Sequence, residues 1–254
     1  MNLKKGMLII DRGSREPEVK EELSAICELV KKKGGYDFTD YCFLEVLPPF
    51  IEEGIKRCIS ENVDTITVMP YFLYPGMKLK ESVKQCAQLC HRMKTRVCIT
   101  KPLSYHSILH CIVLERINEL KGKMNLTISD KNCDILVIGH GSSDGGARTA
   151  FRHTMNTLIP LYKSVNFCFL ELDTPNIYEG VKKTVKFGTG FLIAVPYFLH
   201  KGVHVKKDII AELHSALEKF GLKDIFMTDH LGASTQIIEA ILDRAREAES
   251  RIVF

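Results

Sequence analysis

The sequence predicts an α/β protein built from two tandem units, each a mostly parallel sheet flanked by helices, with a cleft between the units. Three observations support this fold class. Motifs recur in the same order in both halves, short apolar runs alternate with amphipathic stretches, and the motifs follow the predicted strands. The 254 residues are enough for two ordinary domains.

The internal repeat rests on three pairs of matching segments. They are LIIDRGS (8–14) with LVIGHGS (136–142), FLEVLPP (43–49) with FLELDTP (169–175), and VMPYFLYPGMKLK (68–80) with VPYFLHKGVHVKK (195–207). The first pair is offset by 128 residues and the other two by 126, so one two-residue difference in length accounts for all three. We therefore predict units at 1–124 and 132–254, with the boundary in the polar stretch Lys121–Lys131.

Within each unit, strands and helices are expected to alternate. The predicted strands are Met7–Ile10 or Ile135–Ile138, the FLE segment, and Thr65–Met69 or Phe191–Val195. The predicted helices are Val19–Lys33 or Ala147–Tyr162, a helix opened by Pro49 or Pro175, and a further helix such as Lys206–Phe220. A final helix, Thr235–Ala248, is expected to close the second unit. This alternation implies right-handed crossovers and a parallel sheet.

In parallel sheets ligands bind at the carboxyl ends of the strands, and the second unit places chemically useful side chains there. His140 follows the first strand, Glu171 lies near the end of the second, and His204 follows the third. Two imidazoles and a carboxylate suit Fe²⁺, Co²⁺, Ni²⁺ or Zn²⁺, and a histidine can also accept a proton near neutral pH. Each residue taken alone has an ordinary reading as a cap, ion-pair partner or surface group, and we interpret His200 as structural or peripheral.

The first unit offers an internal comparison. Its residues at the three positions are Arg12, Glu45 and Lys78. Because a permanent cation cannot ligate a metal, this unit is not expected to hold one. Arg12 and Lys78 either bind carboxylates of an anionic ligand or are solvated basic residues left after a site was lost.

The segment GHGSSD (139–144) is predicted to form a tight turn before a helix. Backbone N–H groups around Ser142 and Ser143 would then be available to an anion. The segment has neither the lysine of a P-loop nor the third glycine of a dinucleotide fingerprint.

Together, IGHGSSD, the FLE strand and PYFLHKGVHVKKDI resemble the sirohydrochlorin cobalto- and ferrochelatases, the class II chelatases of the CbiX/SirB type, in their long two-unit form. The resemblance covers nearly the whole chain and is most specific in PYFL-x-x-G-x-H-x-x-x-D (Pro196–Asp208) combined with GHGS. It implies flavodoxin-like (chelatase-like) units with a tetrapyrrole bound between them. The two histidines of the family map onto His140 and His204, and its glutamate onto Glu171. The first unit departs from the pattern, with DRGS in place of GHGS.

The resemblance implies insertion of a divalent metal into sirohydrochlorin, in sirohaem or cobalamin biosynthesis. Fe²⁺ is favoured over Co²⁺ or Ni²⁺, because the chain has no histidine-rich tail that could store the latter two. No cofactor beyond this metal substrate is expected, and the chain is expected to act as a monomer equivalent to a fused dimer. The substrate carboxylates would be held by a polar set comprising Ser142, Ser143, Arg12, Lys78, Lys201 and Lys206.

Three other readings are weighed against this one. A tetrapyrrole or metal carrier would use the same residues without turnover. A protoporphyrin ferrochelatase would need an apolar pocket and often a membrane contact, which the polar loops disfavour. A flavodoxin-like regulatory module leaves the His/Glu/His pattern without a role.

Composition limits the alternatives further. The chain is 45% hydrophobic and 26% charged, with a net charge of +4 that is too small to indicate nucleic-acid binding. No apolar run is long enough for a membrane span, and the apolar stretch that begins at Met7 is too short for a signal peptide, so a cytoplasmic protein is expected. The nine cysteines include no C-x-x-C pair; we interpret them as reduced thiols, with a zinc or iron–sulfur site at Cys86 and Cys90 as the alternative.

Overall fold

A computed structural model of the chain describes residues 3–91, 95–186, 188, 191–200, 202, 207–222 and 226–251. The chain forms two compact units. Unit 1 comprises Met1–His106 together with Ala233–Phe254, and unit 2 comprises Ser107–Gly232.

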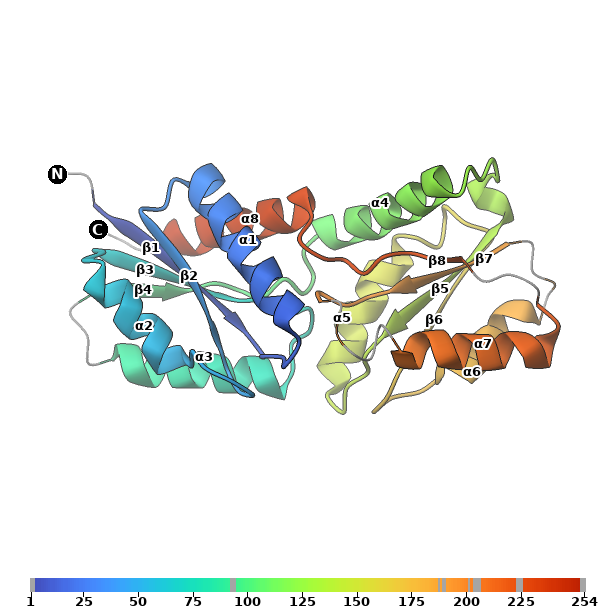
Figure 1. Cartoon of the computed structure of the whole chain (residues 1–254), viewed down its shortest axis with the longest axis horizontal. Coiled ribbons are helices and arrows are strands. Elements are labelled where there is room, and N and C mark those ends of the chain that lie inside the picture. Colours follow the sequence, from blue (N-terminus) through green and yellow to red (C-terminus); the bar gives the residue numbers. More distant parts are fainter. Residues whose placement is uncertain are drawn as a thin grey trace. The chain divides into compact units, whose positions relative to one another are not determined.

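Unit 1 contains a four-stranded parallel sheet in the order β2-β1-β3-β4 (Figure 1). Its strands are β1 (Lys5–Asp11), β2 (Phe38–Phe43), β3 (Thr65–Pro70) and β4 (Arg96–Ile99). One face is covered by α1 (Pro17–Gly34) and α8 (Thr235–Glu249), and the other by α2 (Ile51–Ser60) and α3 (Met77–Cys90).

Unit 2 repeats this topology, with the parallel sheet in the order β6-β5-β7-β8. Its strands are β5 (Cys133–Gly139), β6 (Ser164–Phe169), β7 (Phe191–Pro196) and β8 (Phe226–Met227), preceded by a short 3₁₀ turn at Asp130–Asn132. One face is covered by α4 (Ile108–Lys123) and α5 (Gly145–Asn156), and the other by α6 (Ile177–Val185) and α7 (Ile209–Phe220). The predicted α/β class with parallel sheets is confirmed, and the strand order is that of flavodoxin-like folds.

Periodicity accounts for the elements of unit 1. The predicted helical face of α1 is buried at Leu23, Ile26, Cys27 and Val30, and Gly35 ends the helix in the left-handed conformation at φ 67°. Strand β1 is buried on both sides of the sheet, so its sequence is a continuous apolar run rather than an alternating one.

Most of the cysteines are buried in the packed interior. All nine are free, and Cys42, Cys58 and Cys86 are fully buried in the unit 1 core. Burial raises the pKa of the Cys86 thiol to about 12, so it stays protonated at neutral pH. The role of Cys86 and Cys90 stays a prediction.

Three predicted helices have other boundaries in the structure. The prolines do not open helices: α2 begins two residues after Pro49, and α6 begins two residues after Pro175. In α6 the start is set by a capping box. The Asn176 side chain accepts the Glu179 N–H at 2.9 Å, and the Glu179 carboxylate accepts the Asn176 N–H at 3.0 Å. The helix predicted at 147–162 ends at Asn156 and is followed by turns.

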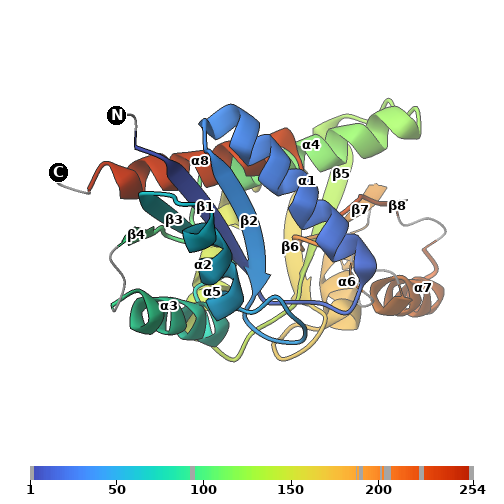
Figure 2. The same cartoon turned by 60° about the vertical axis from the view of Figure 1, so that its left-hand side comes forward.

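The last helix lies in the other unit from the one expected. Helix α8 was predicted to close the second unit, but it packs on β3, β4 and α1 of unit 1 (Figure 2). The carboxylate of Glu249 secures it there, accepting hydrogen bonds from Lys5 Nζ, Tyr36 Oη and Thr67 Oγ1 at 2.6–2.8 Å.

Helix α4, at the equivalent place in the first repeat, belongs to unit 2. Its Arg116 donates to the backbone carbonyls of His230 and Leu231 at 2.8 and 2.7 Å. The compact units therefore change at 106/107 and 232/233, whereas the predicted limits 1–124 and 132–254 follow the sequence repeat.

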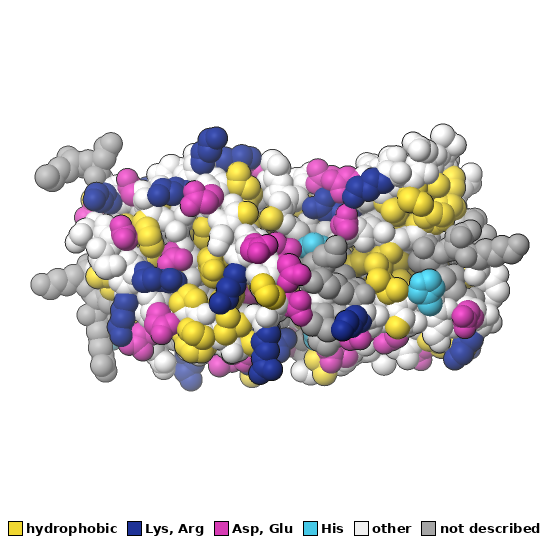
Figure 3. Space-filling model, viewed as in Figure 1, with side chains coloured by type: hydrophobic (Ala, Val, Ile, Leu, Met, Phe, Trp, Pro, Cys, Tyr) yellow, Lys and Arg dark blue, Asp and Glu magenta, His cyan; other side chains and the backbone are white. Residues whose placement is uncertain are grey.

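The surface carries charges of both signs. On the face seen in Figure 3, Lys and Arg side chains are interspersed with Asp and Glu side chains over the described part of the chain. Within the described ranges, no helix combines the length and apolar character needed to cross a membrane.

Candidate active site

The carboxyl ends of β5 and β6 bring His140 and Glu171 together. These strands are neighbours, with Gly139 opposite Phe169 at their last paired position. The ladder then continues for one more residue, because the Glu171 N–H donates to the His140 carbonyl at 3.0 Å. His140 Nε2 lies 3.1 Å from Glu171 Oε1, with the side chains 28% and 44% exposed, so the pair is accessible to a ligand.

Gly141 makes this approach sterically feasible. Its φ is 93°, and a Cβ at this position would overlap the carbonyl oxygen of Glu171. Gly13 has φ 105° and the same relation to Glu45 in unit 1. Gly13 of DRGS and Gly141 of GHGS are therefore required because two strand ends lie close together.

The first unit has the same scaffold with different charges. Arg12 Nε lies 2.9 Å from Glu45 Oε1, and Lys78 Nζ lies 2.6 Å from Glu45 Oε2. The hydrogen bond from Lys78 has the largest effect on the pKa of Glu45 and lowers it. The hydrogen bond from Arg12 lowers it further, by a smaller amount. These three residues, which the repeat places at equivalent positions, are in contact. Each carboxylate oxygen of Glu45 is paired with a cation. Binding of substrate carboxylates by Arg12 or Lys78 stays a prediction.

An aromatic ring contacts His140 from the loop after β7. Phe198 and His140 meet edge to face, with ring centroids 6.3 Å apart and planes at 62°. The loop is held to the sheet by the Tyr197 N–H, which donates to the Ile138 carbonyl at 2.8 Å. Phe198 thus restricts the orientation of the imidazole without competing for its nitrogen atoms.

An ion pair beside the site was missed at the sequence level. Asp173, two residues after Glu171, has a side chain only 3% exposed and is bound in bidentate fashion by Arg148 of α5, with Nε 3.1 Å from Oδ2. By the repeat, these residues correspond to Leu47 and Lys20 of unit 1. A comparison of the two halves position by position would have shown this difference in charge.

Some backbone N–H groups of the turn before α5 are hydrogen-bonded by side chains of the same turn. Asp144 caps the helix by accepting the Gly146 N–H at 2.9 Å, and its own N–H donates to Ser142 Oγ at 3.1 Å. Ser142 is half-buried and Ser143 is exposed. Their predicted contact with the substrate is not tested by these bonds and stays a prediction.

The remaining predicted residues, His204, Lys201 and Lys206, lie outside the described residues. They belong to the connection between β7 and α7, and His200 at its start is half-buried. In the described part of the chain no group of three or more His, Cys, Asp or Glu side chains could hold a metal ion. Of the three predicted metal ligands, the structure describes two, His140 and Glu171.

The geometry of these two donors is compatible with a shared cation. With 3.1 Å between Nε2 and Oε1, an ion about 2.1 Å from each would subtend an angle of about 95°. That angle is close to the octahedral value and somewhat below the tetrahedral one. The two atoms could thus occupy adjacent coordination positions and leave others open.

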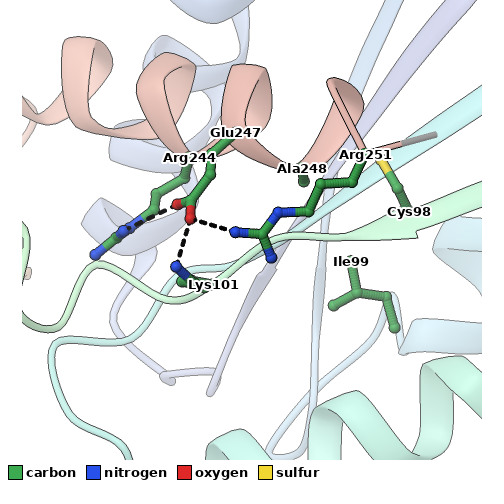
Figure 4. A pocket seen from close by; sticks show the side chains of 7 residues that line it. All are labelled: Cys98, Ile99, Lys101, Arg244, Glu247, Ala248 and Arg251. Atoms are coloured by element: carbon green, nitrogen blue, oxygen red, sulfur yellow. Dashed lines mark hydrogen bonds and ion pairs between the residues drawn. The ribbon is translucent and has the colours of Figure 1, made fainter. Parts of the chain in front are cut away.

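A cavity of about 280 Å³ lies elsewhere, between β4 and α8 of unit 1 (Figure 4). Around it, the Glu247 carboxylate is bound by Lys101, Arg244 and Arg251. Arg244 also donates to two backbone carbonyls, at 2.9 and 2.8 Å. These ion pairs hold the end of α8 in place, and none of the predicted site residues lines the cavity.

The chain matches a family model, curated relatives and solved structures. The CbiX family model matches twice, over residues 6–120 and 134–248. A sirohydrochlorin ferrochelatase of Priestia megaterium is 26% identical over 226 residues, which cover 84% of this chain and 81% of the relative. A sirohydrochlorin cobaltochelatase of the same organism is 27% identical over 207 residues, covering 80% and 67%.

Two solved structures share the fold over nearly the whole chain. SirB from Bacillus subtilis with Fe³⁺ has a TM-score of 0.83 at 23% identity and covers 99% of this chain and 100% of its own. CbiX, described as the terminal enzyme for biosynthesis of siroheme in denitrifying bacteria, has a TM-score of 0.69 at 16% identity and covers 96% and 99%. At these identities the structures support the fold.

Proposed function

Since the chain belongs to the CbiX family, we propose that it inserts a divalent metal ion into sirohydrochlorin, using the strand ends of unit 2. The observation that carries this proposal is the His140–Glu171 pair. In unit 1 the same scaffold holds Glu45, and the cations of Arg12 and Lys78 are paired with its carboxylate. Sirohydrochlorin as the substrate is supported by the names of the curated relatives.

The reaction replaces two pyrrole N–H protons with one M²⁺ ion. His140 and Glu171, with His204 as the third expected ligand, would hold the incoming metal through imidazole nitrogen and carboxylate oxygen. Metal binding at Nε2 and Oε1 would displace a proton held between these atoms. As the metal is transferred to the ring nitrogens, each of these two atoms would release the metal and become able to accept one of the departing pyrrole protons.

Fe²⁺ is our proposed metal. Co²⁺ is a competitor, because both ferro- and cobaltochelatases occur among the relatives, and Ni²⁺ is tested beside them. The product would serve sirohaem or cobalamin biosynthesis. We propose that the chain needs no further cofactor and acts in the cytoplasm as a monomer equivalent to a fused dimer.

The test is anaerobic metal insertion into sirohydrochlorin, followed by the change in visible absorbance with Fe²⁺, Co²⁺ and Ni²⁺. His140→Ala and Glu171→Gln are expected to lower kcat/KM by about 10²–10⁴-fold, the usual range for losing a proton-transfer group. Glu45→Gln is the matched control, since it makes the same change on the scaffold that holds no histidine, and its rate should stay close to that of the wild type.

Two outcomes would oppose the proposal. If the protein binds sirohydrochlorin but never exceeds the spontaneous insertion rate, it is a carrier. If Glu45→Gln reduces insertion as strongly as Glu171→Gln, the reaction is not confined to unit 2.

A further inference from the structure

Leu172, the residue directly after Glu171, combines two unfavourable properties. The residue is 68% exposed, and its φ is 61°. A left-handed backbone is costly for a residue with a branched side chain, and exposure removes any compensation from burial in the folded chain. One exposed leucine is ordinary in itself, but an exposed leucine in a strained conformation is not.

The conformation at position 172 is imposed by its surroundings. The Glu171 carbonyl lies against Gly141. The side chain of Asp173, the residue after Leu172, is buried and paired with Arg148. The chain must therefore turn sharply between Glu171 and Asp173. Glycine or asparagine would adopt this backbone with less strain, so the local structure does not explain a leucine.

The matching turn in unit 1 shows the same feature. Val46 has φ 78° and is 47% exposed, and the Leu47 N–H donates to the Glu45 carbonyl at 3.0 Å, which closes a tight three-residue turn. This turn provides a matched position where the strain is present beside a glutamate that is already paired with two cations.

We propose that Leu172 is a substrate-positioning residue that supports the apolar face of the tetrapyrrole next to the His140–Glu171 pair. The inference rests on the proposed function. A tetrapyrrole is a broad, flat apolar ring with carboxylates at its rim, and sites for such ligands combine apolar contacts with a few polar groups. Leu172 is joined to the glutamate that would hold the metal, so the ring face and the metal would be presented together.

The experiment compares Leu172→Gly, Leu172→Asn and Leu172→Met in the full chain. Glycine and asparagine should raise the midpoint of urea unfolding, because they relieve the strain at φ 61°. The same two variants should weaken binding of metal-free sirohydrochlorin about tenfold, measured by fluorescence titration, and raise KM by a similar factor with kcat little changed. Leu172→Met keeps an apolar side chain and should bind within about twofold of the wild type.

Val46→Gly is the control for the strain itself. It should raise the urea midpoint in the same way and leave sirohydrochlorin affinity unchanged. Wild-type affinity in both Leu172→Gly and Leu172→Asn would overturn the inference, as would an equal loss of affinity in Val46→Gly. A wild-type chain that inserts metal while the Leu172 variants bind normally refutes only the role of Leu172. A wild-type chain that binds no sirohydrochlorin refutes the proposed function and this inference together.

Discussion

At the scale of single residues, the two units use one backbone scaffold with opposite electrostatics at its strand ends. In unit 2 a carboxylate faces an imidazole, which can exchange its proton for a metal ion. In unit 1 the equivalent carboxylate faces an ammonium and a guanidinium group, which lower its pKa and so favour its ionised form. Two substitutions are therefore enough to separate a potential metal site from an ion-pair cluster.

Restoring histidines should convert the cluster of unit 1 into a metal site. We expect the double variant Arg12→His, Lys78→His to bind one more Co²⁺ per chain than the wild type, measured by calorimetric titration. The backbone is already suitable, since Gly13 and Glu45 repeat the geometry of Gly141 and Glu171. The lost ion pairs are largely exposed, so the cost in stability should be at most about 1 kcal/mol.

The control is the triple variant that also carries Glu45→Ala, which should lose the additional Co²⁺. An unchanged stoichiometry in the double variant would show that the scaffold of unit 1 cannot bind a metal even with histidines present.

The Arg148–Asp173 pair should be a strong determinant of the local structure. Arg148→Ala would leave the Asp173 carboxylate buried with only its backbone donor, the Thr174 N–H. We expect a loss of about 2–3 kcal/mol in the free energy of unfolding, measured by urea denaturation. The double variant Arg148→Ala, Asp173→Leu copies the apolar residue of unit 1 and should recover most of this loss. Equal destabilisation in both variants would contradict the explanation.

The site residues could be predicted from the sequence more readily than the ion pair beside them. His140 and Glu171 could be predicted to meet, because they follow neighbouring parallel strands in repeated motifs. Arg148 and Asp173 lie at positions where the two repeats differ, on a helix and in a turn, and no pattern within one copy links them. Which side chains pair across a turn depends on backbone geometry that the motifs do not encode.

At the scale of elements, α8 is attached to unit 1 by a partly buried carboxylate. Burial alone would raise the pKa of Glu249, but hydrogen bonds from Lys5, Tyr36 and Thr67 together lower it below its ordinary value. A carboxyl group whose pKa is lowered by folding stabilises the native state above its unfolded pKa, about 4.3, and loses that contribution as the pH falls through the folded pKa.

Glu249→Gln should therefore destabilise the protein at pH 7 by about 1.5–3 kcal/mol, the range for hydrogen bonds to a charged group. The difference from the wild type should shrink as the pH is lowered from about 5 towards 3. Urea unfolding at several pH values measures this difference in the free energy of unfolding. Hydrogen exchange of the α8 amides shows whether the loss of stability lies in that helix. Glu239→Gln is the control on the same helix, because the Glu239 carboxylate makes only an exposed ion pair with Lys33 at 3.2 Å. A difference that stays constant with pH would exclude the charge as the cause.

At the scale of the whole molecule, the sequence repeat and the compact units divide the chain differently. Each repeat contributes its last helix to the other unit: α4 to unit 2 and α8 to unit 1. This exchange could not be predicted from one sequence, because the repeats have the same strand order and offer equivalent sheet faces. Periodicity indicates that a helix has an apolar face, but not which of two similar sheets that face covers.

The exchange predicts how the chain behaves when it is cut between the repeats. A protease site inserted after Asn125, in the exposed segment that follows α4, would yield fragments corresponding to the two repeats. We expect both fragments to elute together in size-exclusion chromatography under native conditions and to separate only in denaturant. The reason is that α8 buries Ile237, Ile238, Ile241 and Leu242 in unit 1, and each fully buried side chain of this kind contributes about 1.5–3 kcal/mol. The uncut chain treated with the same protease is the control, and fragments that separate without denaturant would show that each repeat keeps its own final helix in solution.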